Sequence, residues 1–375
     1  MQSSTALEFA PMQLDPLGKR PLVSVLMSNY NYAAYLAEAI TSVLTQTYSH
    51  FELVVCDDGS TDNSVEIARK FEARDSRVRV LVKSNGGQAT GFNASFSKCS
   101  GEIICLLDSD DVYRPEKLAR IVAKFRSASG AGCVLHRVLR VDGARRPRGP
   151  LPLFAQLPTG WFGPRILRTG GILSDLPGSM GLNVRREVAL RMFPMPEDPP
   201  LTMCPDQVIQ RLVPLLTRLE AIPDCLVEYR VHSRNTYIQR TVTAQSITRE
   251  LDLTEHLWRY QRHFLERMYP DAVPALAPVS ADRGVKLQRY VRARMLGDPA
   301  SAELYREFMA GVMCVQRPMA HGFWKTTRYM PRAVFGYAAN LYLAQGRAKQ
   351  IAGMIAAVCR RKGRRGVLPS AEAAL

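Results

Sequence analysis

Short apolar runs alternate with longer segments of helical periodicity over the first 125 residues of the chain. The predicted strands are residues 23–27, 52–56, 78–82 and 102–107, each rich in Val, Ile or Leu. The predicted helices are residues 32–46, 64–73, 88–98 and 115–125, in which apolar residues recur every three or four positions. This alternation predicts an α/β fold with a mainly parallel central sheet and helices on both faces.

The length of the chain indicates one domain with additional regions. At 375 residues with 46% hydrophobic residues, it can bury a substantial core and exceeds a typical single domain. Helical periodicity continues through residues 246–269, 281–296 and 301–316. We expect an N-terminal extension over residues 1–20, an α/β domain over residues 21–240, and a helical C-terminal region over residues 245–375.

Cysteine usage and hydropathy indicate a cytoplasmic protein. The eight cysteines are scattered, form no C-x-x-C pair and lie mainly in apolar runs, which is typical of buried free thiols rather than disulfides or a zinc site. The residues before the first predicted strand do not read as a signal peptide. No uncharged apolar run reaches the ~18 residues that a membrane span needs.

The net charge of +16 is concentrated at the C-terminal end. From residue 308 onward there are eleven Arg and Lys against one acid, Glu372. Large apolar residues are mixed with these basic residues, which favours a helix lying on an anionic membrane surface, peripheral to the inner face. A helix packed on the main domain with a solvated basic end explains the same pattern, and the sequence leaves both interpretations open.

Acidic residues gather where two predicted strands end. Asp57 and Asp58 end the second strand, and the carboxylates that end the fourth are Asp108, Asp110 and Asp111. The polar residues just after the first strand are Ser28, Asn29, Tyr30 and Asn31. Because parallel strands deliver their carboxyl ends to one edge of a sheet, we expect all of these side chains to share one site.

Crowded carboxylates without neighbouring His or Cys suit Mg²⁺ or Mn²⁺, whose shell substrate phosphates then complete. Neither GxxxxGK[ST] nor a GxGxxG after a strand is present, so other phosphate-binding loops are not indicated. The alternative for the 108–111 cluster is capping of the helix that Pro115 opens, although one Asp would suffice for that.

The ordered motifs resemble glycosyltransferase family 2, the inverting nucleotide-sugar transferases of GT-A fold. They are "PLVSVLMSNYNYAAYLAEAITSVLTQTYSHFELVVCDDGSTDNS", "NGGQATGFNAS" and "GEIICLLDSDDVYRPEKL". The resemblance is dense over residues 21–125 and continues thinly to about residue 235. It implies a nucleotide-sugar donor, with a UDP-sugar expected, and a glycan, lipid-linked or protein acceptor.

The resemblance also implies roles for residues near the nucleotide. Ser28 and Tyr30 match the loop around the nucleoside base, and Asp58 matches the acid that accepts a hydrogen bond from a pyrimidine N–H. Asn93 matches the donor-pocket segment, but Phe92 replaces the basic residue that many members carry before that Asn. The alternative for Asp58 is a turn formed by "DDGSTD".

The same resemblance implies which residues bind the metal. Asp108 and Asp110 fill the D-x-D positions, so both are expected metal ligands, and Asp111 occupies the adjacent acidic position. His232, in "VEYRVHSRNTY", is expected to approach the metal or the diphosphate, and Arg230 or Arg234 to offset phosphate charge. A hydrogen-bonded structural histidine is the alternative for His232.

The catalytic base of the family matches Asp206, which opens a helix after "GSMGLNVRREVALRMFPMPE". A base must lie within ~3 Å of the attacking hydroxyl when the acceptor is bound. The alternative is that Asp206 is only the N-terminal acid of its helix. Asp198 and Glu197 are lesser candidates for the base.

These assignments imply direct displacement with inversion and metal dependence. No QxxRW motif is present, which favours a single, non-processive transfer in cell-surface polysaccharide or glycoconjugate synthesis. A sugar-phosphate nucleotidyltransferase shares the α/β layout but would carry a Gly-rich basic signature near the first strand. A nucleic-acid-binding protein would fit the isoelectric point of about 9.7, yet the charge lies far from the acidic edge, so no nucleic acid is expected.

Overall fold

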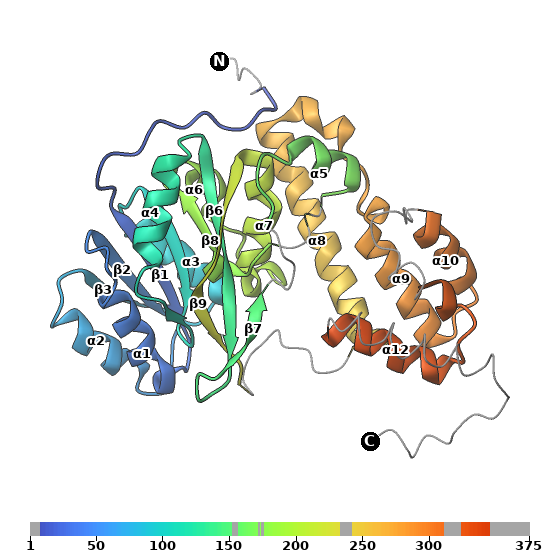
Figure 1. The fold of residues 1–375 in the computed structure, drawn as a ribbon, viewed down its shortest axis with the longest axis horizontal. Coiled ribbons are helices and arrows are strands. Elements are labelled where there is room, and N and C mark those ends of the chain that lie inside the picture. Colours follow the sequence, from blue (N-terminus) through green and yellow to red (C-terminus); the bar gives the residue numbers. More distant parts are fainter. Residues whose placement is uncertain are drawn as a thin grey trace. The chain divides into compact units, whose positions relative to one another are not determined.

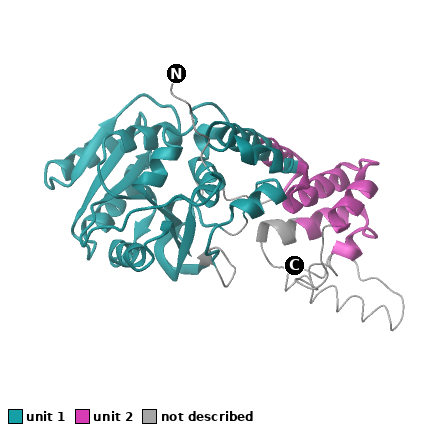
Figure 2. Ribbon diagram, turned by 90° about the horizontal axis from the view of Figure 1, so that it is seen from above, with its two compact units in different colours: residues 1–236, 253–279 teal, residues 237–252, 280–375 magenta. Residues whose placement is uncertain are grey.

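The computed structural model describes residues 8–151, 157–171, 173, 176–232, 242–310 and 324–345. The chain divides into two compact units (Figure 2). Unit 1 contains residues 1–236 and 253–279, and unit 2 contains residues 237–252 and 280–375. Residues 253–279 join unit 1 because Leu257, Phe264 and Leu265 are buried in its core.

The described part of unit 1 is built on a nine-stranded sheet with the order β3-β2-β1-β4-β8-β6-β9-β5, and β7 pairs with β6 (Figure 1). The strands are β1 Val23–Asn29, β2 Phe51–Asp57, β3 Val78–Val82, β4 Ile103–Asp108, β5 Val112–Tyr113, β6 Ala131–Val141, β7 Pro147–Leu151, β8 Leu182–Arg185 and β9 Arg218–Arg230. The four strands predicted from the apolar runs are β1 to β4, and they pair in parallel, which confirms the α/β fold class.

Antiparallel pairing begins beyond β4. The short β8 lies antiparallel to both β4 and β6, while β6 and β9 are parallel to each other. β5 pairs antiparallel with β9 and thereby brings the C-terminal end of β9 beside the segment that follows β4. This pairing places Arg230 and His232 next to the acidic cluster at residues 108–111.

Helices cover both faces of the sheet, as the β1 side chains show. Val25 and Met27 point into the core beneath α1 and α4, while Leu26 between them points into the core beneath α3 and α7. Alternate side chains of a strand face opposite sides, so a run that is apolar at every position needs cover on both. The helices of unit 1 between the strands are α1 Ala33–Leu44, α2 Ser64–Glu72, α3 Gln88–Ser97, α4 Lys117–Ser127, α5 Gly163–Thr169, α6 Arg186–Met192 and α7 Pro205–Leu216.

The remaining described helices are α8 Ala244–Met268, α9 Arg283–Leu296, α10 Ser301–Ala310 and α12 Arg332–Gln345. Short 3₁₀ segments are η1 Ser179–Gly181, η2 Leu201–Met203, η3 Pro270–Ala275 and η4 Val279–Ala281. Unit 2 has its own small core, in which Tyr290, Phe308, Trp324 and Phe335 pack together. Residues 346–375, which hold most of the predicted basic tail, lie outside the described residues.

The described cysteines are free thiols, as the sequence predicted. Cys56, Cys99, Cys105, Cys133 and Cys204 are buried, and Cys225 is half-buried. Burial raises the pKa of Cys56 and Cys105 to about 11, and that of Cys133 and Cys204 to about 12, because a thiolate is poorly solvated there. These thiols therefore act as small apolar core groups.

Candidate active site

The order of the parallel strands brings the predicted site residues to one edge. β1 lies between β2 and β4, with Asn29 paired to Asp57 and Ser28 paired to Asp108. Neighbouring strands are ~4.8 Å apart, so the ends of β2 and β4 are separated by roughly 10 Å. Asp58, which directly follows β2, and Asp108, which ends β4, are thus held at the same edge of the sheet.

Asp57 stabilises the turn after β2. Its carboxylate accepts hydrogen bonds from the Asn29 side-chain amide at 2.7 Å, the Ser60 hydroxyl at 2.7 Å and the Ser60 N–H at 2.8 Å. Asp57 is buried, with these donors around it. It is the residue of "DDGSTD" that forms the turn.

Asp58 has a different set of partners. Lys83 Nζ lies 2.5 Å from its Oδ1, and Gly86 and Gly87 donate their N–H groups at 3.0 and 2.8 Å. The carboxylate therefore holds residues 84–87 in place. Gly87 adopts φ +93°, a conformation that favours glycine. Sequence reasoning missed Lys83, although a lysine directly after the third predicted strand lies at the same edge.

Asp108 lies at the centre of the acidic cluster. Its Oδ1 accepts a hydrogen bond from Gln88 Nε2 at 2.7 Å, and the Ser179 hydroxyl donates to its Oδ2 at 3.4 Å. Burial, together with the negative charges of Asp110 and Asp206, raises the pKa of Asp108 to about 7. Asp108 is therefore close enough to both Asp110 and Asp206 for their charges to disfavour its ionised form.

Asp206 lies in the first turn of α7, where the sequence predicted it. Its Oδ1 accepts a hydrogen bond from the Gln207 N–H at 2.9 Å, which is the contact expected of an acid at a helix N-terminus. Its other oxygen faces Gly178, where an added Cβ would lie 3.9 Å away. Burial raises the pKa of Asp206, so this carboxylate binds a proton more readily than an exposed one.

Asp110 contacts the end of β9. His232 Nε2 lies 2.9 Å from Asp110 Oδ2, and the imidazole stacks on Tyr35 with ring centroids 5.0 Å apart. Arg230 donates its Nε–H to the Asp110 carbonyl at 3.0 Å and pairs with Glu38 at 2.5 Å. Arg230 thus supports the backbone of the cluster. Arg234 lies outside the described residues.

Asp111 is fully buried behind these residues. Its Oδ1 accepts the Arg230 N–H at 2.9 Å, and its Oδ2 has no hydrogen-bond partner. Burial raises the pKa of Asp111 well above its usual range, with Asp110 and Asp108 adding to the effect. Asp111 therefore ties β9 to the segment after β4.

The other predicted site residues are Ser28, Tyr30 and Asn93, and they lie in three different surroundings. Ser28 faces Gly91 of α3, where a Cβ would approach the serine hydroxyl to 2.8 Å, so glycine allows the helix to lie close to β1. Tyr30 is 45% exposed at the edge. Asn93 donates to Glu197 at 2.8 Å and exchanges hydrogen bonds with the Met195 backbone. Asn93 therefore holds the segment before α7.

The acidic cluster fits a divalent cation that is shared with a phosphate ligand. Among the described residues, no three His, Cys, Asp or Glu side chains are arranged to hold a metal by themselves. Mg²⁺ and Mn²⁺ sites in phosphate-binding enzymes need only one or two carboxylates. A cation beside Asp108 and Asp110 would also relieve the repulsion that raises the Asp108 pKa.

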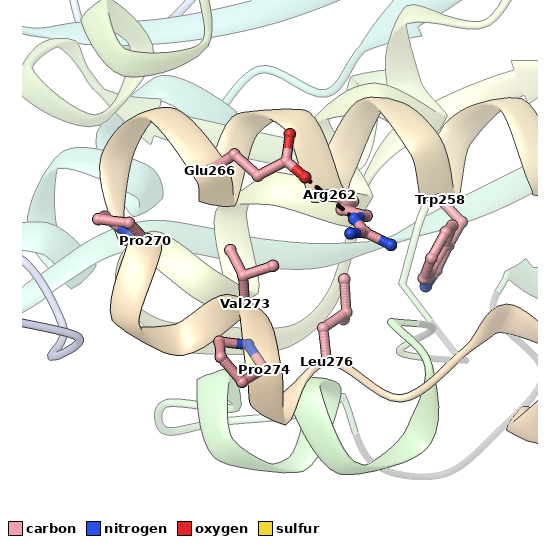
Figure 3. Close-up of a pocket in the computed structure, with 7 residues that line it drawn as sticks. All are labelled: Trp258, Arg262, Glu266, Pro270, Val273, Pro274 and Leu276. Atoms are coloured by element: carbon pink, nitrogen blue, oxygen red, sulfur yellow. Dashed lines mark hydrogen bonds and ion pairs between the residues drawn. The ribbon is translucent and has the colours of Figure 1, made fainter.

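A surface cavity of about 560 Å³ lies elsewhere in unit 1, between α8 and η3 (Figure 3). The residues that line it are Trp258, Arg262, Glu266, Pro270, Val273, Pro274 and Leu276. Arg262 and Glu266 pair with each other at 3.0 Å on its wall. The cavity contains none of the predicted site residues.

Comparison with known proteins decides the family. Residues 24–188 match the sequence model of Glycosyl transferase family 2. An uncharacterized glycosyltransferase of Nostoc sp. is 34% identical over 249 residues, which cover 66% of this chain and 76% of that protein. The chain belongs to glycosyltransferase family 2. It is therefore an enzyme of the glycosyltransferase type, as the motifs predicted.

Other members of the family match over shorter stretches. The hyaluronan synthase of Pasteurella multocida is 35% identical over 136 residues, or 36% of this chain and 14% of the synthase. The glycosyltransferase GlyG of Streptococcus pneumoniae is 46% identical over 94 residues, or 25% of this chain and 31% of GlyG. These matches cover a minor part of either relative.

A solved structure shares the fold of this chain. The crystal structure of Staphylococcus aureus TarS 1-349 in complex with UDP-GlcNAc superposes with a TM-score of 0.53 and 19% identity. The match covers 81% of this chain and 87% of that one. It confirms the GT-A type of fold. Among the described residues, no helix is long and apolar enough to cross a membrane.

Proposed function

We propose that this family member transfers a sugar from a nucleoside-diphosphate sugar to an acceptor hydroxyl, with inversion and with help from a divalent metal. The observation that carries the proposal is that Asp108, at the carboxyl edge of the sheet, lies near both Asp110 and Asp206. This arrangement puts acids suited to a metal beside an acid suited to accept a proton.

Asp108 and Asp110 would hold Mg²⁺ or Mn²⁺, with His232 as a further ligand or a support for Asp110. When bound, the cation stabilises the negative charge that grows on the departing nucleoside diphosphate. Asp58, Ser28 and Tyr30 would surround the nucleoside, and Lys83 fixes the orientation of Asp58. A UDP-sugar is the proposed donor, which the UDP-GlcNAc complex of TarS supports.

Asp206 would remove the proton from the acceptor hydroxyl as its oxygen attacks the anomeric carbon. Its raised pKa favours this role, because a base works best when its pKa lies near the operating pH. The new C–O bond forms on the face opposite the departing diphosphate, so one displacement inverts the anomeric centre. The proton moves to Asp206, and no covalent enzyme intermediate forms.

The acceptor is proposed to be a growing cell-surface polysaccharide or glycoconjugate, with one sugar added per encounter. The name of the hyaluronan synthase relative supports a glycan acceptor. We propose a cytoplasmic enzyme that contacts an anionic membrane through its basic C-terminal end. In unit 2, Tyr329, Val334 and Tyr337 are 74%, 53% and 66% exposed. They accompany Arg328 and Arg332, a pairing of aromatic and basic groups suited to a membrane interface.

Replacement of Asp206 by Asn tests the proposal. Asp206→Asn should lower the transfer rate by about 10²- to 10⁴-fold, since the amide cannot accept the proton. Donor binding, measured by the thermal shift that UDP-sugars cause with and without Mn²⁺, should remain. Asp198→Asn, at the lesser candidate for the base, is the comparison variant and should leave the transfer rate unchanged. Unchanged turnover in Asp206→Asn would refute the assignment, and no shift with any nucleotide-sugar would refute the proposed donor.

A further inference from the structure

Lys117 of α4 is fully buried, although lysine is among the residue types least often found inside a protein. Its Nζ donates to the Met180 carbonyl at 2.8 Å and lies 3.0 Å from His136 Nε2. The same nitrogen lies 4.0 Å from the centroid of the Tyr113 ring. A buried amine is costly, so these contacts have to compensate for its loss of water.

Met180 belongs to a tight turn over residues 177–181, which contains η1. The Gly181 N–H donates to the Gly178 carbonyl at 2.9 Å and closes the turn. A Cβ at Gly181 would clash with Pro177 and would approach the His136 carbonyl to 3.0 Å. The turn is therefore packed directly on β6, and only a residue without a side chain fits at its end.

The 177–181 turn connects the two halves of the site. Ser179 donates its hydroxyl to Asp108 at 3.4 Å, and Gly178 faces Asp206. Gln210, one helical turn after Asp206, donates to the Pro177 carbonyl at 2.8 Å. The turn is thus fastened to α7 at its start and to α4 at Met180.

We propose that Lys117 is a positioning residue, which fixes the 177–181 turn and thereby the distance between the Asp108 and Asp206 carboxylates. An apolar side chain in the same space could fill the core but could not bind the Met180 carbonyl. A misplacement of ~1 Å between reacting groups can cost about 10²-fold in rate. Lys117 touches neither donor nor acceptor in this arrangement, and its effect passes through the backbone of the turn.

This inference rests on the proposed function, and a variant of similar length tests it. Lys117→Met removes the donor and retains an apolar chain of the same reach. The matched control is Lys124→Met on the same helix, where the lysine forms a half-exposed pair with Glu220 at 2.7 Å. Two readouts are compared, namely the kcat and KM of transfer and the amide hydrogen exchange of residues 178–182.

The expected result is a kcat that falls by about 10- to 100-fold in Lys117→Met, with KM for the donor changed by less than about threefold. Amide exchange of residues 178–182 should accelerate at least about tenfold while exchange in β1 and β2 stays the same. Lys124→Met should behave like the wild type in both readouts.

Wild-type kcat and wild-type exchange of the turn in Lys117→Met would overturn the inference. Faster exchange spread evenly over the sheet would also overturn it, because that pattern indicates general loss of stability. If the single variant does not fold, the double variant Lys117→Met/His136→Leu replaces both polar partners by apolar groups and is judged by the same readouts. If the wild type transfers no sugar, the proposed function fails, while the exchange data still decide whether Lys117 holds the turn.

Discussion

The imidazole of His232 lies 2.9 Å from the Asp110 carboxylate and stacks on the ring of Tyr35. The stacking restricts the plane of the imidazole, and the Nε2 atom is the ring nitrogen that contacts Asp110. The contact joins the segment after β9 to the acidic edge of the sheet. A histidine held in this way can either bind a metal itself or orient the carboxylate that does.

We therefore predict that His232→Ala weakens Mn²⁺-dependent binding of a UDP-sugar by about 10- to 100-fold. Isothermal titration calorimetry with and without Mn²⁺ measures the effect. His263→Ala, on the exposed face of α8, serves as the control because His263 is distant in sequence from the site and 66% exposed. Equal loss of binding without metal would show that His232 acts on the nucleotide instead.

Replacement of Lys83 should affect both stability and donor binding. Lys83→Met leaves the Asp58 carboxylate, which is only 3% exposed, without its cation, so the free energy of unfolding should fall by about 1–3 kcal/mol. Donor affinity should fall by about tenfold as residues 84–87 lose their support. Urea unfolding and donor titration measure the two effects.

Lys70→Met is the control for this experiment. Lys70 forms an exposed pair with Glu66 at i,i+4, and such pairs contribute about 0.3–0.5 kcal/mol. A loss of stability as large as that of Lys83→Met would contradict the view that burial of Asp58 makes the Lys83 contact important.

The pH dependence of stability should carry a contribution from Lys117. Burial lowers the pKa of Lys117 to about 7, whereas an unfolded lysine titrates near 10.4. Between these values the unfolded chain binds more protons than the folded one, so the Lys117 contribution to the free energy of unfolding rises with pH. The rise should reach up to about 1.4 kcal/mol per pH unit.

Urea unfolding of the wild type and Lys117→Met at pH 7, 8 and 9 isolates this contribution. Other groups, such as the buried cysteines, titrate in the same window with the opposite sign, but they are common to both proteins. The difference in unfolding free energy between the two proteins should therefore grow in favour of the wild type as pH rises. A difference that stays constant over this range would contradict the low pKa of Lys117.

Membrane contact predicts a dependence on lipid charge. The chain should sediment with vesicles that contain anionic phosphatidylglycerol and much less with vesicles of phosphatidylcholine alone. Tyr329→Ser combined with Tyr337→Ser should reduce binding to the anionic vesicles several-fold. Leu190→Ser, at an exposed apolar position of unit 1, is the control. Self-association without vesicle binding would instead identify this surface as an interface between copies of the chain.

The sequence predicted the strands and helices whose pattern of apolar residues is contained within one short segment. β1, β2 and β4 are apolar at most positions because both of their faces are covered, whereas the edge strand β3 buries mainly alternate residues. Each strand is separated from the next by a helix. Asp58 and the acids at residues 108–111 lie at the ends of two of these strands. Their meeting at one edge therefore required only the rule that parallel strands end together.

The parts that the sequence did not reveal depend on pairing between distant segments. β9 runs for 13 residues with mixed polarity, and its position follows from pairing with β6 and β5. Lys83 and Lys117 gave no recognisable pattern, because a single lysine in a sequence does not show whether it is buried. Asn93 and Asp111 were predicted near the donor, but their hydrogen bonds to the Met195 and Arg230 backbones became visible only in the structure.

The buried thiols of the core can be used to measure how often the sheet opens. Cys105 of β4 and Cys133 of β6 lie on either side of β8 in the sheet with no exposed surface, and their high pKa values leave almost no reactive thiolate at neutral pH. A maleimide can therefore modify them only in molecules whose sheet has come apart. The rate of this labelling follows how often the sheet opens, and it needs neither donor nor acceptor.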